Sequence, residues 1–304
     1  MPAVSEFYGI PGPVPFVDVE INADNRLYID PHAVRLRRSE LEFVDEAVDA
    51  LDSFFGEVTG CVIDGSTSER RRGEDLLQHF VEPWETRLGM ATRGFRGHGG
   101  ASEVGTRIWD TLTDDVEALV RVGVLRQLED LPLFVDGIDR DITSDVTTRV
   151  IYSALARFTA SMIQTYPQFT AAGHEVREIE KQVWDPSSLR WTTSDVLLPM
   201  ANGKELLLVP DGWARRTLLM SAVRFYETSV LSYAQLEQAA ILSDGTLAKT
   251  PKDLLKQQPD LGRGRETITR VTKRAIGNED DLLARFKSFV ASRLAEDDRG
   301  AAAT

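Results

Sequence analysis

The chain has 304 residues, 42% of them apolar and 27% charged, which is typical of a packed globular protein. No apolar run approaches the roughly 18 residues of a membrane span, and the N-terminal segment lacks the features of a signal peptide. Cys61 is the only cysteine, which excludes an intrachain disulfide and a cysteine-rich zinc site. We therefore expect a soluble, cytoplasmic protein without a membrane partner.

The net charge of −13 is unevenly distributed. Residues 1–148 carry 29 acidic and 14 basic side chains, whereas residues 149–304 carry 19 acidic and 21 basic ones. Because an acidic surface repels nucleic acid, we expect any nucleic-acid contact to come from the second half or to need bound cations. Only 7 of the 35 basic residues are lysines. Codon bias of a GC-rich bacterial genome accounts for this; arginine enrichment for phosphate binding is the rival reading, which composition alone does not support.

The N-terminal region predicts a small hairpin. Residues 1–15 are rich in proline and glycine and are expected to be irregular. Val17, Val19 and Ile21 alternate with acidic residues, which is the period of a half-buried strand. Turn residues follow at 22–25, and residues 27–29 give a second short strand before Asp30-Pro31 ends it.

Apolar residues at helical spacing predict most of the remaining elements. Helices are expected over residues 40–55, 67–81, 101–112 and 115–125. The longest apolar stripe runs without interruption from residue 146 to residue 162, with Thr143 or Ser144 as the expected N-cap. Further helices are expected at about 213–239, 250–257, 264–276 and 279–295.

Between these helices, residues 176–184, 191–198 and 205–209 predict three antiparallel strands, with Asn202-Gly203 as the strongest hairpin signal. The expected fold class is α+β and predominantly helical, with an N-terminal hairpin and a central antiparallel three-stranded meander. A single compact unit over residues 1–304 is the simplest organisation. A subdivision into residues 1–170 and 171–304 is the alternative.

An acidic cluster precedes the longest stripe. It consists of Asp136, Asp139, Asp141 and Asp145. Carboxylates of this kind bind hard divalent cations, so the cluster is a candidate site for Mg²⁺ or Mn²⁺, although its spacing does not match an EF-hand. Two other readings are open: helix capping with solvent-exposed carboxylates, and an acidic loop that binds a partner.

Two basic segments are candidates for phosphate binding. The glycine-rich stretch at 94–100 leads into a helix and carries Arg93, Arg96 and His98 beside it or within it. The second segment, residues 249–274, has eight basic and three acidic residues. Its candidate phosphate ligands are Arg263, Arg265, Arg270, Lys273 and Arg274. For the glycine-rich stretch, the alternative is a flexible surface loop. For residues 249–274, the alternatives are a solvated helix face and a face packed against the acidic half.

The meander also offers an incomplete nuclease-like pattern, in which an acid on one strand is followed by an acid and a lysine on the next. Asp185 or Asp195 with Lys204 and Glu205 is one set. The other set is the run Glu178-Ile-Glu180-Lys181. No HExxH or GxSxG spacing occurs, so a zinc hydrolase and a serine hydrolase of those types are not expected. Cys61 is interpreted as a buried small residue instead of a nucleophile.

Three segments resemble a group of uncharacterised bacterial proteins. They are Pro15-Phe-Val-Asp-Val-Glu-Ile with Leu27-Tyr-Ile-Asp-Pro31, the run at 136–145, and the stretch from Leu198-Pro to Leu208-Val-Pro210. The resemblance covers most of the chain and implies one bacterial cytosolic unit in a defence or conflict setting. It implies no catalytic residue. The group is expected to have a basic residue after Val-Pro, where this chain has Asp211, so a role assigned to that position is in doubt.

The pairing of an acidic cluster with a separate basic segment leads to one functional expectation. The protein is expected to bind nucleic acid or nucleotides. One form of this expectation is the hydrolysis of phosphodiesters with a divalent metal ion. The alternative is a non-catalytic adaptor or inhibitor whose acidic half binds a protein partner. A nucleotide sensor built on the glycine-rich stretch is a third reading. The oligomeric state is not predicted by the sequence.

Overall fold

The computed structural model describes residues 2–23, 25–37, 43–89 and 98–302. It is 53% helical and 14% strand and contains a three-stranded antiparallel sheet, which confirms a predominantly helical α+β fold. Buried apolar side chains from Val4 to Leu294 form one connected core, to which both halves of the chain contribute. Within the described residues, no helix is both long and apolar enough to cross a membrane.

The predicted N-terminal hairpin is not formed by the described residues. After helix α1 (Val4–Tyr8), the Val17 amide donates to the Val209 carbonyl, and Phe16 bridges to Pro210. Strand β1 (Tyr28–Ile29) pairs antiparallel with β5 (Ala214–Arg215). Each arm of the expected hairpin therefore pairs with residues 209–215 instead of with the other arm. These distant residues supply hydrogen-bond partners for the backbone groups of both arms.

Helix α2 (Pro31–Leu36) follows β1 and was not expected from the sequence. Asp30 is 1% exposed, and its carboxylate accepts hydrogen bonds from the amides of His32 and Ala33, which caps the helix. The same carboxylate accepts a 2.6 Å hydrogen bond from the amide of Leu219. Asp30 thereby links the N-terminal segment to a chain segment 189 residues later.

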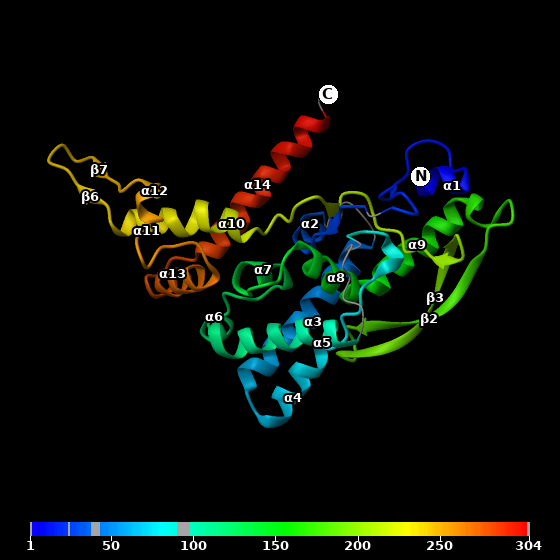
Figure 1. The fold of residues 1–304 in the computed structure, drawn as a ribbon, viewed down its shortest axis with the longest axis horizontal. Coiled ribbons are helices and arrows are strands. Elements are labelled where there is room, and N and C mark those ends of the chain that lie inside the picture. Colours follow the sequence, from blue (N-terminus) through cyan, green and yellow to red (C-terminus); the bar gives the residue numbers. More distant parts are fainter. Residues whose placement is uncertain (1, 24, 38–42, 90–97, 303–304) are drawn as a thin grey trace.

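A layer of helices forms the lower half of the molecule in Figure 1. It contains α3 (Val44–Asp64), α4 (Thr67–Leu76), α5 (His98–Asp110) and α6 (Glu117–Arg121). The π-helix η2 (Thr111–Asp115) continues α5 directly. Short turns η1 (Trp84–Thr86) and η3 (Leu128–Asp130), with α7 (Leu131–Phe134), connect this layer to the rest. The four expected helices are present, although several bounds differ.

The long apolar stripe forms two helices instead of one. Helix α8 (Arg140–Val150) and helix α9 (Tyr152–Thr165) are separated at Ile151, whose φ and ψ are −92° and 15°. The N-cap is Asp139, not Thr143 or Ser144. Those two hydroxyls are buried and have other partners: Thr143 donates to the Asp139 carbonyl, and Ser144 accepts from the Ile29 amide.

The meander is confirmed, with a shorter third strand. After turn η4 (Pro167–Thr170), strands β2 (Val176–Asp185), β3 (Arg190–Ala201) and β4 (Lys204–Glu205) pair antiparallel. Asn202 and Gly203 have φ values of 52° and 75°, as a tight hairpin turn requires. The third strand ends early because the Leu207 and Leu208 amides donate to Glu85 and Thr159.

The C-terminal helices lie on the opposite side of the molecule from the sheet (Figure 1). They comprise α10 (Ala222–Phe225), the π-helix η5 (Tyr226–Val230), α11 (Leu231–Glu237), α12 (Lys252–Leu255), α13 (Arg265–Gly277) and α14 (Leu282–Ala302). An unexpected hairpin of β6 (Ala240–Ile241) and β7 (Leu247–Ala248) projects from this region (Figure 1). Its apolar residues Ile241, Leu242 and Leu247 are 76%, 49% and 53% exposed.

Candidate functional site

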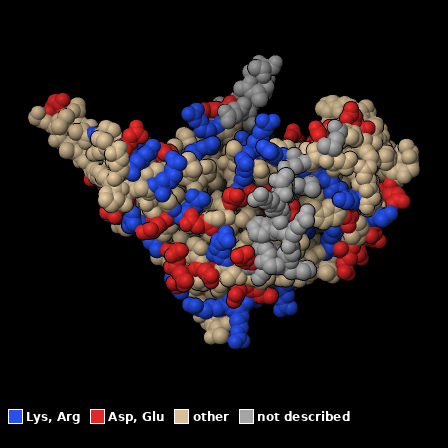
Figure 2. Space-filling view, viewed as in Figure 1, with Lys and Arg blue, Asp and Glu red and all other residues tan. Residues whose placement is uncertain are grey.

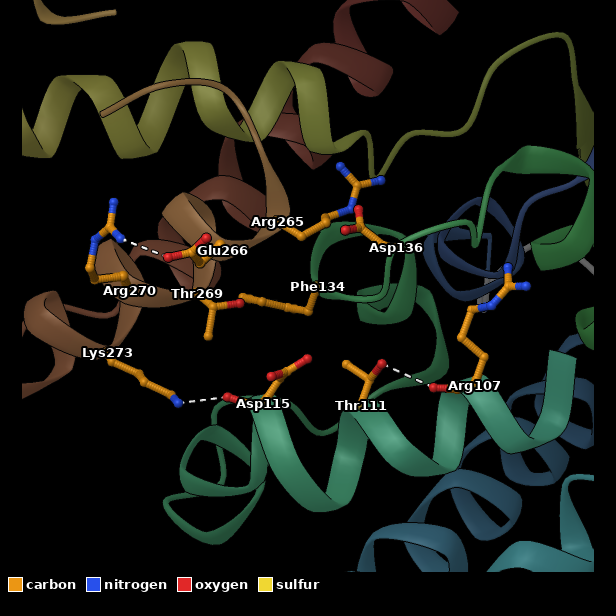
Figure 3. Close-up of a pocket in the computed structure, with 10 residues that line it drawn as sticks. All are labelled: Arg107, Thr111, Asp115, Phe134, Asp136, Arg265, Glu266, Thr269, Arg270 and Lys273. Atoms are coloured by element: carbon orange, nitrogen blue, oxygen red, sulfur yellow. Dashed lines mark hydrogen bonds and ion pairs between the residues drawn. The ribbon is translucent and has the colours of Figure 1, made fainter. Parts of the chain in front are cut away.

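A cavity of about 670 Å³ lies between α5 with η2 on one side and α13 on the other (Figure 3). This volume is within the usual range for small-molecule sites. Phe134 at the end of α7, together with Asp136, forms a further wall. The lining residues are Arg107, Thr111, Asp115, Phe134, Asp136, Arg265, Glu266, Thr269, Arg270 and Lys273.

Helical periodicity explains why these side chains line one cavity. Residues four apart share a helix face, and Arg265, Thr269 and Lys273 follow this spacing on α13. Arg107 and Thr111 have the same spacing on α5 and η2. The other face of α13 carries its buried apolar residues, so packing of that face against the core turns the charged face toward the cavity.

Two of the four cationic side chains are already bonded within the protein. Lys273 Nζ donates to the carbonyl of Asp115 at 2.6 Å, which ties α13 to η2. Arg270 Nη1 donates to Glu266 Oε1 at 3.2 Å, and Arg270 also contacts the Asp260 carbonyl. These contacts fix both cations at the cavity wall and reduce the charge available to a ligand.

Arg107 provides a third cation. Its guanidinium lies directly over Gly137, where an added Cβ would be 2.3 Å from Arg107 Nη1. Gly137 also has a φ of 75°, so both the backbone and the close approach require glycine. Across the ranges that the structure describes, the Arg107 guanidinium makes no hydrogen bond or ion pair. Its donors face the cavity side of α5 (Figure 3).

Arg265 is the most distinctive residue of the cavity. It is half-buried, and its Nε is fully buried without a hydrogen-bond acceptor among the described residues. Burial lowers the pKa of Arg265, and the negative charge of Asp136 opposes that change. The Asp136 carboxylate points toward the guanidinium in Figure 3. A buried donor without an acceptor is costly. This Nε has no accessible surface, so an anion in the cavity would contact the guanidinium through its terminal nitrogens.

The surface around the cavity is not uniformly basic. Figure 2 shows lysine and arginine side chains interleaved with aspartate and glutamate over this face. Broad, sequence-independent attachment to a polyanion needs a continuous basic surface. The arrangement therefore favours recognition of a discrete phosphorylated group inside the cavity.

The structure brings together only part of the sequence-predicted phosphate ligands. Arg265, Arg270 and Lys273 line the cavity. Arg263 instead pairs with Glu227 at 2.9 Å, and Arg274 pairs with Glu237. The remaining candidates belong to the glycine-rich stretch: Arg93 and Arg96 lie outside the described residues, and His98 is the first residue of α5.

The four aspartates of the acidic cluster are also divided. Asp136 lines the cavity, while the Asp139 side chain caps α8 by accepting from the amides of Asp141 and Ile142. They do not form a compact metal-ligand group. Within the described ranges, the compact group of three is instead Glu57, Cys61 and Glu69, whose ligand atoms lie within 4.8 Å of one another. A Mg²⁺ or Mn²⁺ site at the aspartates stays a prediction.

The compact group around Cys61 has an ordinary structural explanation. Cys61 is 1% exposed, as expected, and its thiol donates to Glu69 at 3.3 Å. Burial and the neighbouring Glu69 raise the pKa of the thiol to about 12. Arg72 lies 2.9 Å from Glu57 and neutralises it. A protonated thiol is a poor metal ligand and a poor nucleophile.

Asp145 lies in an unusual electrostatic setting on α8. Burial raises the pKa of its carboxyl well above the usual value, and the charges of Asp141, Glu82 and Asp139 raise it further. Arg149 acts in the opposite direction. Asp141 also contacts Gly89, where an added Cβ would be 2.9 Å from the Asp141 carboxylate. Carboxyls whose pKa is raised in this way are common at catalytic and cation-binding sites.

A buried polar network that sequence reasoning missed connects the sheet to the helices. Glu85 is 0% exposed, and its Oε1 accepts from Tyr152 at 3.0 Å and from Lys181 at 3.2 Å. Arg149 lies 3.6 Å from the same oxygen, and Lys181 lies 3.6 Å from Glu205. The sequence singled out Lys181 and Glu205 on the meander but not Glu85, because Glu85 lies about a hundred residues before them in the chain.

The nuclease-like pattern on the meander is not assembled. Glu178 and Glu180 are exposed, whereas Lys181 points to the other face of the sheet and into the Glu85 network. Asp185 accepts hydrogen bonds from Ser187 and Ser188 in the β2–β3 turn, at the far end of the strand from Glu205. Lys181 and Glu205 thus act with Glu85 in holding the sheet.

Comparison with protein families places these features in context. The model of the domain of unknown function DUF8370 matches residues 12–221, which is more than two thirds of the chain. The chain belongs to the DUF8370 family. No curated protein and no solved structure matches it.

The cavity lies across the boundary of the DUF8370 match. Arg107, Asp115 and Asp136 lie within the matched residues, whereas Arg265, Arg270 and Lys273 lie beyond them. The Glu85 network and the acidic cluster lie wholly inside the match. The part of the chain that follows the family domain therefore supplies half of the cavity.

Proposed function

We propose that this DUF8370 protein binds a nucleotide, or a nucleotide unit of a nucleic acid, in the cavity between α5 and α13. The observation that carries the proposal is the half-buried Arg265, which lines the cavity with three other cationic residues, Arg107, Arg270 and Lys273. Arg107 adds a second guanidinium, which makes no hydrogen bond or ion pair with the described residues. Guanidinium groups bind phosphate oxygens through paired, charge-assisted hydrogen bonds.

The acidic residues of the cavity favour a nucleotide over a simple anion. Asp136 and Glu266 are exposed carboxylates beside Arg265 and Arg270. Carboxylates repel an inorganic anion, but they accept hydrogen bonds from sugar hydroxyls and from amino groups of bases. Phosphate at the arginines and sugar or base at the carboxylates would satisfy both kinds of group.

Equilibrium binding of fluorescent nucleotides tests this proposal. We expect Arg265→Gln to weaken binding by at least about tenfold, because a charge-assisted hydrogen bond contributes about 1.5–3 kcal/mol and tenfold is about 1.4 kcal/mol. Arg263→Gln is the matched control, since Arg263 is two residues away, is exposed and pairs with Glu227. Absence of nucleotide binding by the wild-type protein, or equal losses in both variants, would refute the proposal.

Metal-dependent phosphodiester hydrolysis is a second candidate function. It is favoured by the nearness of Asp145 to Asp139, Asp141 and Glu82, because a bound cation would relieve the repulsion among these carboxylates. The test is cleavage of labelled single-stranded and duplex nucleic acid in the presence of Mg²⁺ or Mn²⁺. Asp145→Asn is expected to abolish cleavage, whereas Asp114→Asn, which alters an exposed carboxylate, is expected to preserve it. Equal cleavage by both variants, or none by the wild type, would remove hydrolysis as a function.

The acidic adaptor or inhibitor stays a prediction. A protein contact through a different surface is favoured by one observation, the exposed β6–β7 hairpin in the second half of the chain. Apolar residues at the tip of a projecting element are typical of protein contacts. The experiment is sedimentation of the wild type and of an Ile241→Ser/Leu247→Ser variant over a concentration series. Self-association in the wild type alone would support a contact through this hairpin, and monomers throughout would argue against a second copy as the partner.

A further inference from the structure

A second cavity of about 380 Å³ shares one lining residue with the first. It lies between the start of α8 and the segment that leads into α10, and its wall includes Pro132, Leu218, Met220, Val223 and Arg224. Arg265 lines this second cavity as well as the first one. The two cavities therefore share one lining residue, and it is a cation.

The two cavities differ in chemistry. The first is lined mainly by charged groups from α13, α5 and η2. The second has a largely apolar wall, to which polar residues also contribute: Asp139, Arg140, Thr217, Ser221, Arg224 and Arg265. A largely apolar wall with several polar residues accommodates the flat face of a base together with the polar groups on its rim.

We propose that the two cavities hold two consecutive nucleotides joined by a phosphodiester, with Arg265 bound to the linking phosphate. The inference rests on the proposed nucleotide binding and names its substrate class. A single nucleotide in the first cavity leaves the second one empty. A dinucleotide unit fills both and places its internal phosphate where the structure has a shared cation.

The charges near the junction agree with this placement. Arg140 and Arg224 line the second cavity, and Arg107 lines the first, so the phosphates on either side of the unit have cations nearby. Arg140 is held in position by its stacking over the Tyr28 ring at 4.8 Å and by its hydrogen bond to the Arg216 carbonyl. Such a unit occurs both as a free dinucleotide and as a segment of a single strand.

The experiment compares three ligands of the same base: a 5′-phosphorylated mononucleotide, the dinucleotide and a decanucleotide. Their affinities are measured for the wild-type protein and for Val223→Trp, which places a large ring in the second cavity at a position that is 51% exposed. Val122→Trp is the control, because Val122 is 58% exposed and lines neither cavity. Thermal unfolding verifies that each variant is folded.

We expect the wild type to bind the dinucleotide at least tenfold more tightly than the mononucleotide. Val223→Trp should abolish this difference without changing the affinity for the mononucleotide, and Val122→Trp should leave both unchanged. Equal affinities for the two ligands in the wild type would overturn the two-nucleotide inference and leave the proposed function intact. No binding of any ligand would overturn the proposed function itself. The decanucleotide binds as tightly as the dinucleotide if the unit is part of a strand, and more weakly if it is a free dinucleotide.

Discussion

Individual buried charged residues stabilise the fold through contacts that the sequence alone does not predict. Glu85 is the clearest case, because its carboxylate is 0% exposed and faces Lys181, Arg149 and the Tyr152 hydroxyl. The positive charges of Arg149 and Lys181 outweigh the effect of burial and hold the pKa of Glu85 below its usual value. Burial of this group is tolerable only because its partners are present.

We predict that Glu85→Gln lowers the free energy of unfolding by about 3 kcal/mol, since it leaves two cations in the interior with a weaker partner. Urea unfolding measures the change. Glu175→Gln is the control, because Glu175 and its partner Arg177 are both largely exposed, and its expected effect is within about 0.5 kcal/mol. Similar effects of the two substitutions would show that the Glu85 network does not stabilise the fold.

A second buried carboxylate predicts a dependence of stability on pH. Burial acts to raise the pKa of Glu129, but hydrogen bonds from His32 and Arg35 and the charge of Arg35 bring it to about 2. A carboxylate with a lowered pKa in the folded state stabilises the protein above its unfolded pKa of roughly 4.3, and this contribution is lost as the pH falls toward 2.

We therefore predict that stability of the wild type falls between about pH 4.5 and pH 2, and that Glu129→Gln makes this fall less steep. Urea unfolding at several pH values provides the measurement. Glu6→Gln, at an exposed position, is the control and should follow the wild type. An unchanged acid profile in Glu129→Gln would contradict the assignment of this group.

At the scale of elements, close packing of α5 against the end of α4 fixes the position of one wall of the cavity. Gly105 of α5 lies against α4 so closely that an added Cβ would be 2.1 Å from the backbone oxygen of Leu77. Backbone atoms cannot move aside as a flexible side chain does. The position of α5, and with it that of Arg107, depends on the absence of a side chain at residue 105.

We predict that Gly105→Ala destabilises the protein by about 1–3 kcal/mol through overpacking. Gly56→Ala is the matched control on α3, where no atom lies within 4 Å of the added carbon, and it should stabilise the helix by up to about 1 kcal/mol. Thermal unfolding gives both values. The opposite order of the two variants would show that α4 and α5 are not packed as described.

Some elements could be predicted from the local sequence pattern, and others could not. The Asn202-Gly203 turn was predictable, because its positive φ values suit these two residues. The break at Ile151 was not, since the apolar stripe continues through it. Helix α2 was missed although Asp30 as N-cap and Pro31 at the first helical position are local start signals, because six residues are too few to show a helical apolar period.

At the scale of the whole molecule, the residues after the DUF8370 match form part of the same core. Phe225 and Phe134 have ring centroids 6.3 Å apart, and Lys287 lies 2.7 Å from the buried Asp130. We predict that residues 1–221 alone do not unfold cooperatively and bind a hydrophobic dye, because the buried surface of α7 becomes exposed.

Co-production of residues 222–304 should restore a cooperative transition if the two parts associate. The control shortens the exposed β6–β7 hairpin by replacing residues 241–247 with two glycines, and the unfolding transition should not change. Cooperative unfolding of residues 1–221 on their own would show that the family domain is an independent unit.

The sequence by itself determined the α+β class, the meander and most helices, because these depend on spacing and turn chemistry within a short window. It also indicated Asp136, Arg265, Arg270 and Lys273 as charged groups of interest. Only the tertiary structure decided that these four share a cavity with Arg107, and that Asp139, Asp141 and Asp145 of the acidic cluster do not line it. The physical reason is that packing of the apolar faces of α5, α7 and α13 fixes which charged faces meet, and a single sequence does not specify which helices are neighbours.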